Sequence, residues 1–185
     1  MLIRSFPWIE GAADTEPGGP LHVARLLQGG NRHDNPAHYG VLYASRDASS
    51  AVAERLRALR RWEITNADLL RPDGARYAMV SLDEASVDGL VDLDDPAILN
   101  QRRIRPSSVA TGDRRATRRM ALELYEEGAD GLAWWSTIEA SWINVSVFSE
   151  RALSGITVAA GPEILTVEHP TVRAAAAVLG IELRA

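Results

Sequence analysis

The stretch Gly29–Leu56 reads GGNRHDNPAHYGVLYASRDASSAVAERL and changes character twice along its length. Its first eight residues combine Gly, Asn, Arg, His, Asp and Pro, a composition typical either of a surface turn or of the edge of a binding site. The next segment, YGVLYAS (39–45), is mostly apolar and predicts a short buried strand. Asp47 follows and can cap a helix that continues to about Trp62. The stretch therefore predicts a loop, a strand and a helix in direct succession.

The predicted helix has an apolar side and a side that carries one carboxylate. The apolar stripe, which we expect to face the core, consists of Ala48, Val52, Leu56 and Leu59. Glu54 lies off this stripe, on a side that it shares with Ala51 and Ala58. Because alanine side chains are small, these neighbours leave space beside the Glu54 carboxylate.

The composition of the chain is that of a soluble globular protein, and we expect residues 1–185 to form one domain. No apolar run approaches the length of a membrane span, and the first residues lack the basic-then-apolar pattern of a signal peptide. Without cysteine the chain has no disulfide, thiolate zinc site or cysteine nucleophile, and we expect it to be cytoplasmic.

The charge of the chain argues against a broad nucleic-acid surface. The formal net charge is -5, whereas binding to nucleic acid requires a basic face, so we expect no direct nucleic-acid partner. All 20 basic residues are arginine, which genomic base composition explains most simply; alternatively, one or two of them bind phosphate groups. We interpret the run RRATRR (114–119) as a solvated helix face.

The remaining sequence predicts an α+β fold, because its strands and helices do not alternate regularly. We expect residues 1–20 to be irregular and leave 97–112 unassigned. Strands are predicted at 77–82, 88–96, 131–136 and 142–148, with a hairpin around Gly161-Pro162 within 156–167. Further helices are predicted from Asp113 to Gly128 and over 171–179.

Several common site motifs are absent from the sequence. It contains no GxxxxGK[ST] phosphate loop, no GxGxxG after a strand and no GxSxG elbow. His33, Asp34 and His38 lie close together, but the loop is short and no further ligand clusters with them. We therefore expect no metal site.

Four residues remain as a candidate constellation: Arg32 in the loop, Tyr43 in the strand, Glu54 on the helix and Ser136 at the end of GLAWWS (131–136). Each also has an ordinary explanation. Glu54 can pair with Arg57 three residues later, Tyr43 can belong to the core, and Ser136 can bond to a turn.

Taken in order, the segments GGNRHDNP, YGVLYAS, AVAE and GLAWWS resemble the RES-domain family, which is named for its Arg, Glu and Ser. Arg32, Tyr43, Glu54 and Ser136 fall on the motif positions of that family. The strand WINVSVF (142–148) resembles the one that follows in the family, and the resemblance covers residues 21–151.

Two features of the chain depart from the family pattern. His33 stands where the family has an aromatic residue after its Arg, and Asn31 is inserted before Arg32. Arg25 is matched to a further arginine near the first strand of the family.

The resemblance implies a fold similar to the core of ADP-ribosyltransferase toxins, with a small split β-sheet and flanking helices around a dinucleotide cleft. It implies the toxin half of a RES–Xre toxin–antitoxin pair, which consumes NAD+ by hydrolysis or phosphorolysis of the nicotinamide–ribose bond. NAD+ is then a substrate, inorganic phosphate is a candidate co-substrate, and no cofactor is needed. An Xre-type antitoxin is the implied partner, and a homodimer is compatible with the sequence.

The chemistry of that bond suggests a role for each catalytic candidate. Glu54 would stabilise the positive charge that develops on the ribose, and Arg32 would bind the pyrophosphate or a phosphate. Tyr43 would stack on the nicotinamide ring, and Ser136 would bind the ribose or hold Glu54. The substrate-binding candidates are Gly30, His33, Asn35, Trp135 and Arg25.

The polar loop is accordingly interpreted as the edge of a site. Trp134 and Trp135 cannot both face that site, because a strand alternates its sides. Two alternatives stay open: an ADP-ribosyltransferase that modifies a protein, and a non-catalytic RES-like protein that binds a nucleotide or a partner.

Overall fold

The computed structural model describes residues 1–85 and 87–185. The strands are β1 (Leu2–Trp8), β2 (Val41–Ser45), β3 (Glu63–Thr65), β4 (Arg76–Asp83), β5 (Leu90–Asp92), β6 (Gly131–Trp135), β7 (Ile143–Phe148), β8 (Thr157–Ile164) and β9 (Glu182–Arg184). The α-helices are α1 (Ala48–Leu59), α2 (Pro96–Gln101), α3 (Pro106–Val109), α4 (Arg114–Glu126), α5 (Ser149–Ala152) and α6 (Pro170–Leu179). Short 3-10 helices are η1 (Arg25–Leu27), η2 (Asn66–Leu69) and η3 (Leu153–Gly155).

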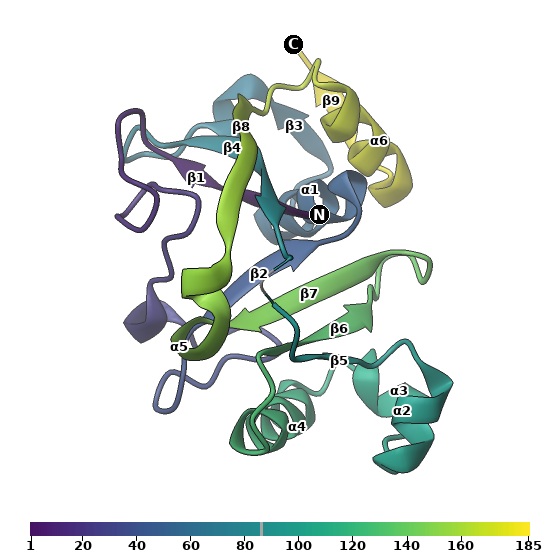
Figure 1. Ribbon diagram of the computed structural model, residues 1–185. Helices are drawn as coiled ribbons and strands as arrows, with labels where there is room; N and C mark the ends of the chain where they lie inside the picture. Colours follow the sequence, from purple (N-terminus) through teal and green to yellow (C-terminus); the bar gives the residue numbers. More distant parts are fainter. Residues whose placement is uncertain (86) are drawn as a thin grey trace.

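The main sheet is divided into two half-sheets. Its strand order is β5-β6-β7-β2-β1-β4-β8, with one parallel pair, β5 and β6, and antiparallel neighbours elsewhere. At the centre, β2 and β1 are paired only at Ile3 and Ser45, whereas β1 pairs with β4 along its whole length. Figure 1 shows the two halves lying one above the other. The predicted α+β class with a split sheet and flanking helices is confirmed.

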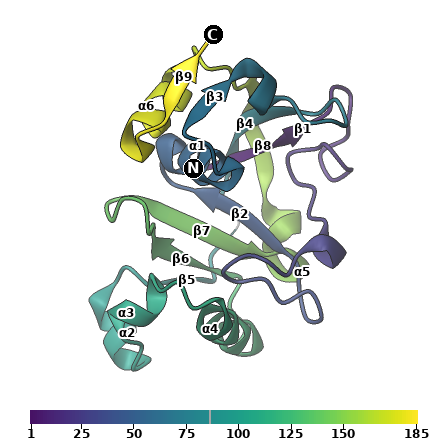
Figure 2. The same cartoon turned by 180° about the vertical axis from the view of Figure 1, so that it is seen from behind.

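Helices flank both half-sheets, as Figures 1 and 2 show. One core cluster joins the half-sheet of β6, β7 and β2 to α4 and the short helices before it, through residues such as Leu132, Val109 and Leu124. Another joins α1 and α6 to the β4 side, through residues such as Val52 and Tyr77. A third cluster, which includes Leu2, Leu42 and Val145, packs across both half-sheets.

The helices that flank the split begin as the sequence predicts. Asp47 caps α1 by accepting a hydrogen bond from the Ser50 backbone N at 3.0 Å. Asp113 caps α4 through Arg115 N at 2.9 Å, and Gly128, with a φ of 99°, follows the end of that helix.

The prediction of an irregular segment over residues 1–20 is wrong for its first part. Residues 2–8 form β1, a central strand of the sheet, with Leu2 and Phe6 buried in the core. Arg4 and Pro7 interrupt the apolar pattern and conceal the strand. Arg4 is accommodated because it donates to the carbonyl oxygens of Pro20 and His22, both at 2.8 Å.

The predicted hairpin at Gly161-Pro162 is also wrong. Both residues lie inside β8, a single edge strand that pairs with β4 and has register shifts near Met79 and Ser81. Proline lacks a backbone donor and is tolerated on an edge strand, and Gly161 adopts a φ of 102°. The pair therefore produces an irregularity in a strand and not a turn. The segment 97–112, left unassigned above, falls within α2, α3 and the turn before α4.

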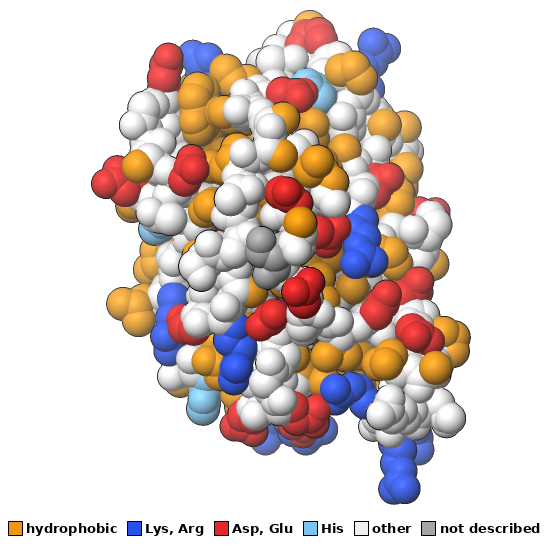
Figure 3. Space-filling model, in the orientation of Figure 1, with side chains coloured by type: hydrophobic (Ala, Val, Ile, Leu, Met, Phe, Trp, Pro, Cys, Tyr) orange, Lys and Arg blue, Asp and Glu red, His pale blue; other side chains and the backbone are white. Residues whose placement is uncertain are grey.

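Charged side chains are unevenly distributed over the surface. In Figure 3 acidic side chains gather near the middle of the face, and several arginines project at the lower right, where α2 and α3 lie in Figure 1. The net negative charge is therefore compatible with arginine-rich regions elsewhere on the protein.

Candidate active site

A cavity of about 250 Å³ opens where the half-sheets part. Its walls come from β1, β2, β6 and β7, from one side of α1, from the first residue of α4 and from the loop before β2. Arg32, Tyr43 and Glu54, three of the four predicted catalytic residues, line this cavity. Segments far apart in the sequence are thus brought together at the split.

Glu54 is the sole carboxylate among the described residues that line the cavity. Ala51 and Ala58 of the same helix lie beside it and leave the expected space. Ser136 lies behind it, 2% exposed, and its Oγ donates to Glu54 Oε1 at 3.5 Å, a long hydrogen bond. The same Oγ accepts from the Ile138 backbone N at 3.1 Å. Ser136 is therefore placed to orient the carboxylate and does not itself line the cavity.

Arg32 is 5% exposed and forms part of the cavity wall. Its guanidinium lies over the Trp134 ring, 4.5 Å from the ring centroid. One terminal nitrogen, Nη1, donates to the carbonyl oxygens of Val109 at 3.0 Å and Thr111 at 2.7 Å. The Nε of Arg32 is buried and makes no hydrogen bond within the protein.

The electrostatic surroundings of Arg32 are unfavourable for its charge. Burial, followed by repulsion from Arg114, lowers the pKa of Arg32 to about 10, and Glu54 and Tyr43 only partly oppose this effect. The guanidinium still carries its charge near neutral pH. An anion in the cavity would relieve the repulsion.

The loop that carries Arg32 is organised around Asp34, which is buried. Its Oδ2 accepts from the backbone N of Gly29 at 2.9 Å and of Asn31 at 2.7 Å. Its Oδ1 accepts from the Tyr43 hydroxyl at 2.8 Å, and that hydroxyl in turn accepts from His33 N at 3.1 Å. Burial, and then the charge of Asp34, raise the pKa of Tyr43 well above its ordinary value, so the phenol stays neutral.

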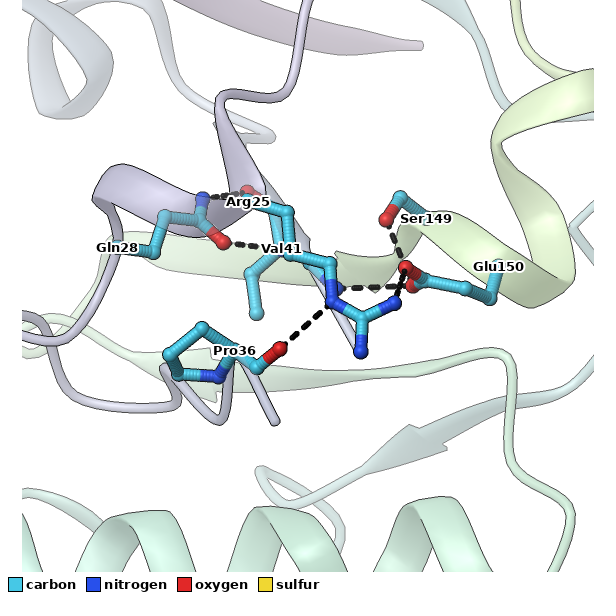
Figure 4. A network of polar contacts seen from close by, with 7 residues as sticks. Arg25, Gln28, Pro36, Val41, Ser149 and Glu150 are labelled. Atoms are coloured by element: carbon cyan, nitrogen blue, oxygen red, sulfur yellow. Dashed lines mark hydrogen bonds and ion pairs between the residues drawn. The ribbon is translucent and has the colours of Figure 1, made fainter. Parts of the chain in front are cut away.

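A second network closes the base of the same loop (Figure 4). The Gln28 side chain donates to Val41 O at 2.6 Å and accepts from Val41 N at 2.8 Å. Arg25 donates to Pro36 O at 2.7 Å and to Glu150 at 2.8 Å. Arg25, predicted to bind substrate, instead fastens the loop at a distance from the cavity wall.

His33, another predicted substrate-binding residue, is fully buried and does not line the cavity. Its Nδ1 lies 2.8 Å from the Ser146 Oγ, and its ring meets Trp134 edge-on at 5.4 Å. Burial, then the charges of Arg32 and Arg114, lower the pKa of His33 well below its ordinary value. His33 is therefore a neutral ring that packs next to Arg32 and is not part of the cavity wall.

Gly30, Asn35 and Trp135 also do not line the cavity. Gly30 is exposed, and Asn35 Nδ2 is used inside the loop, where it donates to the Tyr39 hydroxyl at 2.6 Å. Trp135 packs against a core cluster, whereas Trp134 reaches the cavity. Because the sides of a strand alternate, the sequence restricts the site to one tryptophan, and it is Trp134 that lies directly across from Asn144 of the cavity wall.

Residues that sequence reasoning did not assign to the site supply most of its polar groups. Buried polar atoms without a protein partner occur on six residues of the cavity wall: Ser5, Arg32, Arg55, Arg114, Trp134 and Asn144. Apart from the Ser5 hydroxyl, these atoms are obligate N–H donors. The run 114–119 is solvated only in part, because Arg114 lies in the cavity wall and Arg118 is half-buried. Buried donors require acceptors, so the cavity is suited to a ligand rich in acceptor oxygens.

Two properties complete the description of residues 1–85 and 87–185. Within them, no three His, Cys, Asp or Glu side chains are grouped so that they could hold a metal ion. Nor does any helix of these residues combine the length and the apolar character that crossing a membrane requires.

At the split of the mostly antiparallel sheet, the described residues of the cavity combine a lone carboxylate with several arginines. The RES domain family matches residues 12–168, and the chain belongs to that family. The predicted resemblance is confirmed, and the match extends beyond 21–151 at both ends.

Comparison with curated proteins finds no match. Among solved structures, the chain is similar to one from the crystal structure of the M. tuberculosis MbcT–MbcA toxin–antitoxin complex. The TM-score is 0.59 at 17% identity, over 89% of this chain and 83% of the other. At this identity the similarity establishes a shared fold.

Proposed function

We propose that this protein degrades NAD+ by cleaving its nicotinamide–ribose bond and acts as the toxin of a toxin–antitoxin pair. One observation carries the proposal: among the described residues the cavity presents a single carboxylate, Glu54, beside three arginines that each have one buried nitrogen without a partner, Arg32, Arg55 and Arg114. Membership of the RES domain family and the fold shared with a toxin–antitoxin complex support it.

In the proposed reaction the bond between ribose C1′ and the nicotinamide nitrogen breaks, and its electron pair stays on the nitrogen. The cationic ring leaves as neutral nicotinamide, so no general acid is required. Positive charge develops on the ribose, as in glycoside cleavage, and Glu54 stabilises it. An oxygen of water or phosphate then bonds to C1′, and an attacking water loses a proton.

The other groups of the cavity have complementary roles in this proposal. Arg32 binds the phosphates, and the Tyr43 ring offers an aromatic face to the cationic nicotinamide. Ser136 holds Glu54 in position. The substitution of an aromatic residue by His33 does not affect these roles, because His33 lies behind the cavity wall.

The partner in this proposal is an antitoxin protein, of Xre type by family resemblance, that prevents access to the cavity. A cytoplasmic location is proposed with it, because the substrate would be the cellular NAD+ pool. Phosphorolysis, hydrolysis and transfer to a protein share the first bond cleavage and differ only in the acceptor.

The test is release of nicotinamide from NAD+ by the purified protein, with and without phosphate, measured by chromatography. Release that depends on phosphate identifies phosphorolysis, and release without it identifies hydrolysis. Mass spectrometry of the preparation establishes that no antitoxin has been purified with the protein. If the partner-free protein releases no nicotinamide in either condition, the proposed function is wrong.

The decisive variant is Glu54→Gln, which keeps the size of the side chain and removes its charge. We expect nicotinamide release to fall by a factor on the order of 10² to 10³, because a preorganised charge opposite the transition state is lost. Glu126→Gln, an exposed carboxylate on α4, is the matched control and should retain full activity. Retained activity in Glu54→Gln would remove Glu54 from the reaction.

A further inference from the structure

Two arginines from separate elements line the same cavity. Arg32 belongs to the loop before β2, and Arg114 is the first residue of α4; both line the cavity. Their proximity is reflected in the lowered pKa of Arg32, for which Arg114 is the largest contributor after burial. Two like charges held together in a partly desolvated place are costly unless an anion joins them.

The protein itself supplies little compensation for this pair. The Nη1 of Arg32 donates to neutral carbonyl oxygens of Val109 and Thr111, and its Nε has no partner. The Nη1 of Arg114 is likewise buried without a partner. The carboxylate of Asp113 is next in sequence but is exposed and accepts backbone N–H groups of α4. Both arginines therefore retain unused donors.

The positions of the two arginines are fixed relative to each other. The Thr117 hydroxyl donates to Arg32 O at 2.6 Å, and Arg118 Nε donates to Asn31 O at 3.0 Å. Asn35 Nδ2 donates to Arg118 O at 2.9 Å. These three hydrogen bonds tie the loop to the first turns of α4, so the charged pair is held in place before any ligand arrives. Such preorganisation lowers the entropic cost of binding.

Trp134 is the third residue that lines the cavity beside Arg32 and Arg114. Its ring lies against Arg32, and its indole Nε1 is buried without a partner. Indole and guanidinium nitrogens can only donate, so Arg32, Arg114 and Trp134 together offer donors and no acceptor. A phosphate group, with several acceptor oxygens and negative charge, satisfies such a set.

We propose that Arg32, Arg114 and Trp134 form a phosphate-binding subsite, and that Arg114 is its second anion-binding residue. The proposed function is needed only to say whether the bound phosphate belongs to a dinucleotide or is free phosphate. The binding of phosphate to this subsite does not depend on it, because it follows from the donor set alone. Sequence reasoning did not select Arg114, which lies in a run of arginines that resembles a solvated face.

The test measures dissociation constants by titration calorimetry at constant ionic strength, for ADP-ribose and for inorganic phosphate. Arg114→Gln is compared with Arg115→Gln, the exposed neighbour that does not line the cavity. We expect Arg114→Gln to weaken binding about 10- to 100-fold, the range for hydrogen bonds to charged groups. Arg115→Gln should bind as the unmodified protein does, because its side chain lies outside the cavity. Both variants lose one positive charge, so the comparison controls for the change in net charge.

The two ligands distinguish the sources of the phosphate. If Arg114→Gln weakens ADP-ribose binding, the subsite holds the phosphates of the dinucleotide. If it weakens only inorganic phosphate, which the unmodified protein then binds beside ADP-ribose, the subsite holds a free phosphate. The proposal is overturned if the unmodified protein binds neither ligand, if Arg114→Gln binds both as the unmodified protein does, or if both variants lose affinity equally.

A further variant keeps the proposal testable if Arg114→Gln is unstable. Arg114→Lys retains the charge but loses the planar fork of donors, and we expect it to weaken binding less than glutamine does. Circular dichroism establishes that each variant is folded. Phosphate binding that depends on Arg114, combined with no nicotinamide release, would leave the subsite standing and reject the proposed function.

Discussion

Two cavities of similar size, formed by residues that the structure describes, differ in character, and one of them has the features of a ligand site. The cavity at the sheet split is about 250 Å³, and a second, between β1 and the segment 18–28, is about 230 Å³. Each contains an arginine, Arg32 or Arg4, whose pKa burial lowers to about 10. Both arginines donate to two backbone carbonyl oxygens. Arg32, however, also has a buried Nε without a partner, whereas no described residue lining the second cavity has a buried polar atom without a partner.

The comparison shows that neither volume nor a lowered pKa distinguishes a ligand site from a structural cavity here. The two cavities differ in whether buried N–H donors on their walls lack a hydrogen-bond partner. In the second cavity the arginine completes the packing of its own loop, whereas in the first it leaves donors for a molecule from outside. Substitution of Arg32 should therefore reduce activity, whereas substitution of Arg4 should reduce stability and leave activity unchanged.

The largest effect is expected for Arg32→Gln. This variant loses the charge that binds phosphate, and we expect kcat/KM for NAD+ to fall by about 100-fold, as for loss of hydrogen bonds to a charged group. The loss should be mainly in KM, because Arg32 is proposed to bind substrate rather than to act on the ribose. Steady-state kinetics of nicotinamide release measure it. Unchanged KM and kcat would exclude Arg32 from the site.

Arg4→Gln should reduce stability and leave activity unchanged. It removes charged hydrogen bonds to Pro20 O and His22 O, so we expect the free energy of unfolding to decrease by about 2 kcal/mol. Urea denaturation measures this change. The activity per folded molecule should be unchanged, because Arg4 does not line the first cavity. A loss of activity at full stability would mean that the second cavity also serves the reaction.

The smallest effect concerns His33, which lies behind the first cavity. Its pKa is lowered in the folded protein, so the unfolded chain binds a proton that the native protein does not bind. The stabilisation from neutral His33 is complete above the unfolded pKa of about 6.5 and is lost as pH falls below it, by about 1.4 kcal/mol per pH unit.

His33→Gln should remove this part of the slope of unfolding free energy between pH 6.5 and 5, whereas His38→Gln, at an exposed position in the same loop, should keep it. Urea denaturation at several pH values compares the three proteins. Equal slopes in the unmodified protein and His33→Gln would show that His33 does not carry the effect.

Local patterns predicted much of the fold. The helices α1 and α4 were predicted because Asp47, Asp113 and Gly128 are strong end signals. The strands β2, β6 and β7 were predicted because their short segments are rich in apolar and aromatic residues. The strand β1 was missed because Arg4 interrupts its apolar pattern, and the hydrogen bonds that accommodate Arg4 come from carbonyl oxygens of a later loop. No local pattern contains such a compensation.

The candidate site was predictable to a similar degree. Arg32, Tyr43 and Glu54 lie within one stretch, and their expected proximity required only a loop, a strand and a helix in succession. Arg114 and Asn144 come from segments that reach the cavity only through the sheet order and the docking of α4. The choice of Trp134 over Trp135 likewise depends on which side of β6 faces the cavity, and the sequence does not contain that information.

The split in the sheet has a mechanical consequence. Seven residue pairs connect β1 to β4 and five connect β2 to β7, but a single pair joins the two half-sheets. The two halves are therefore connected mainly by side chains: one buried cluster, which includes Leu2, Leu42 and Val145, packs across both. We expect a molecule bound in the cavity to add to this connection, because Ser5 of β1 and Trp134 of β6 both line it.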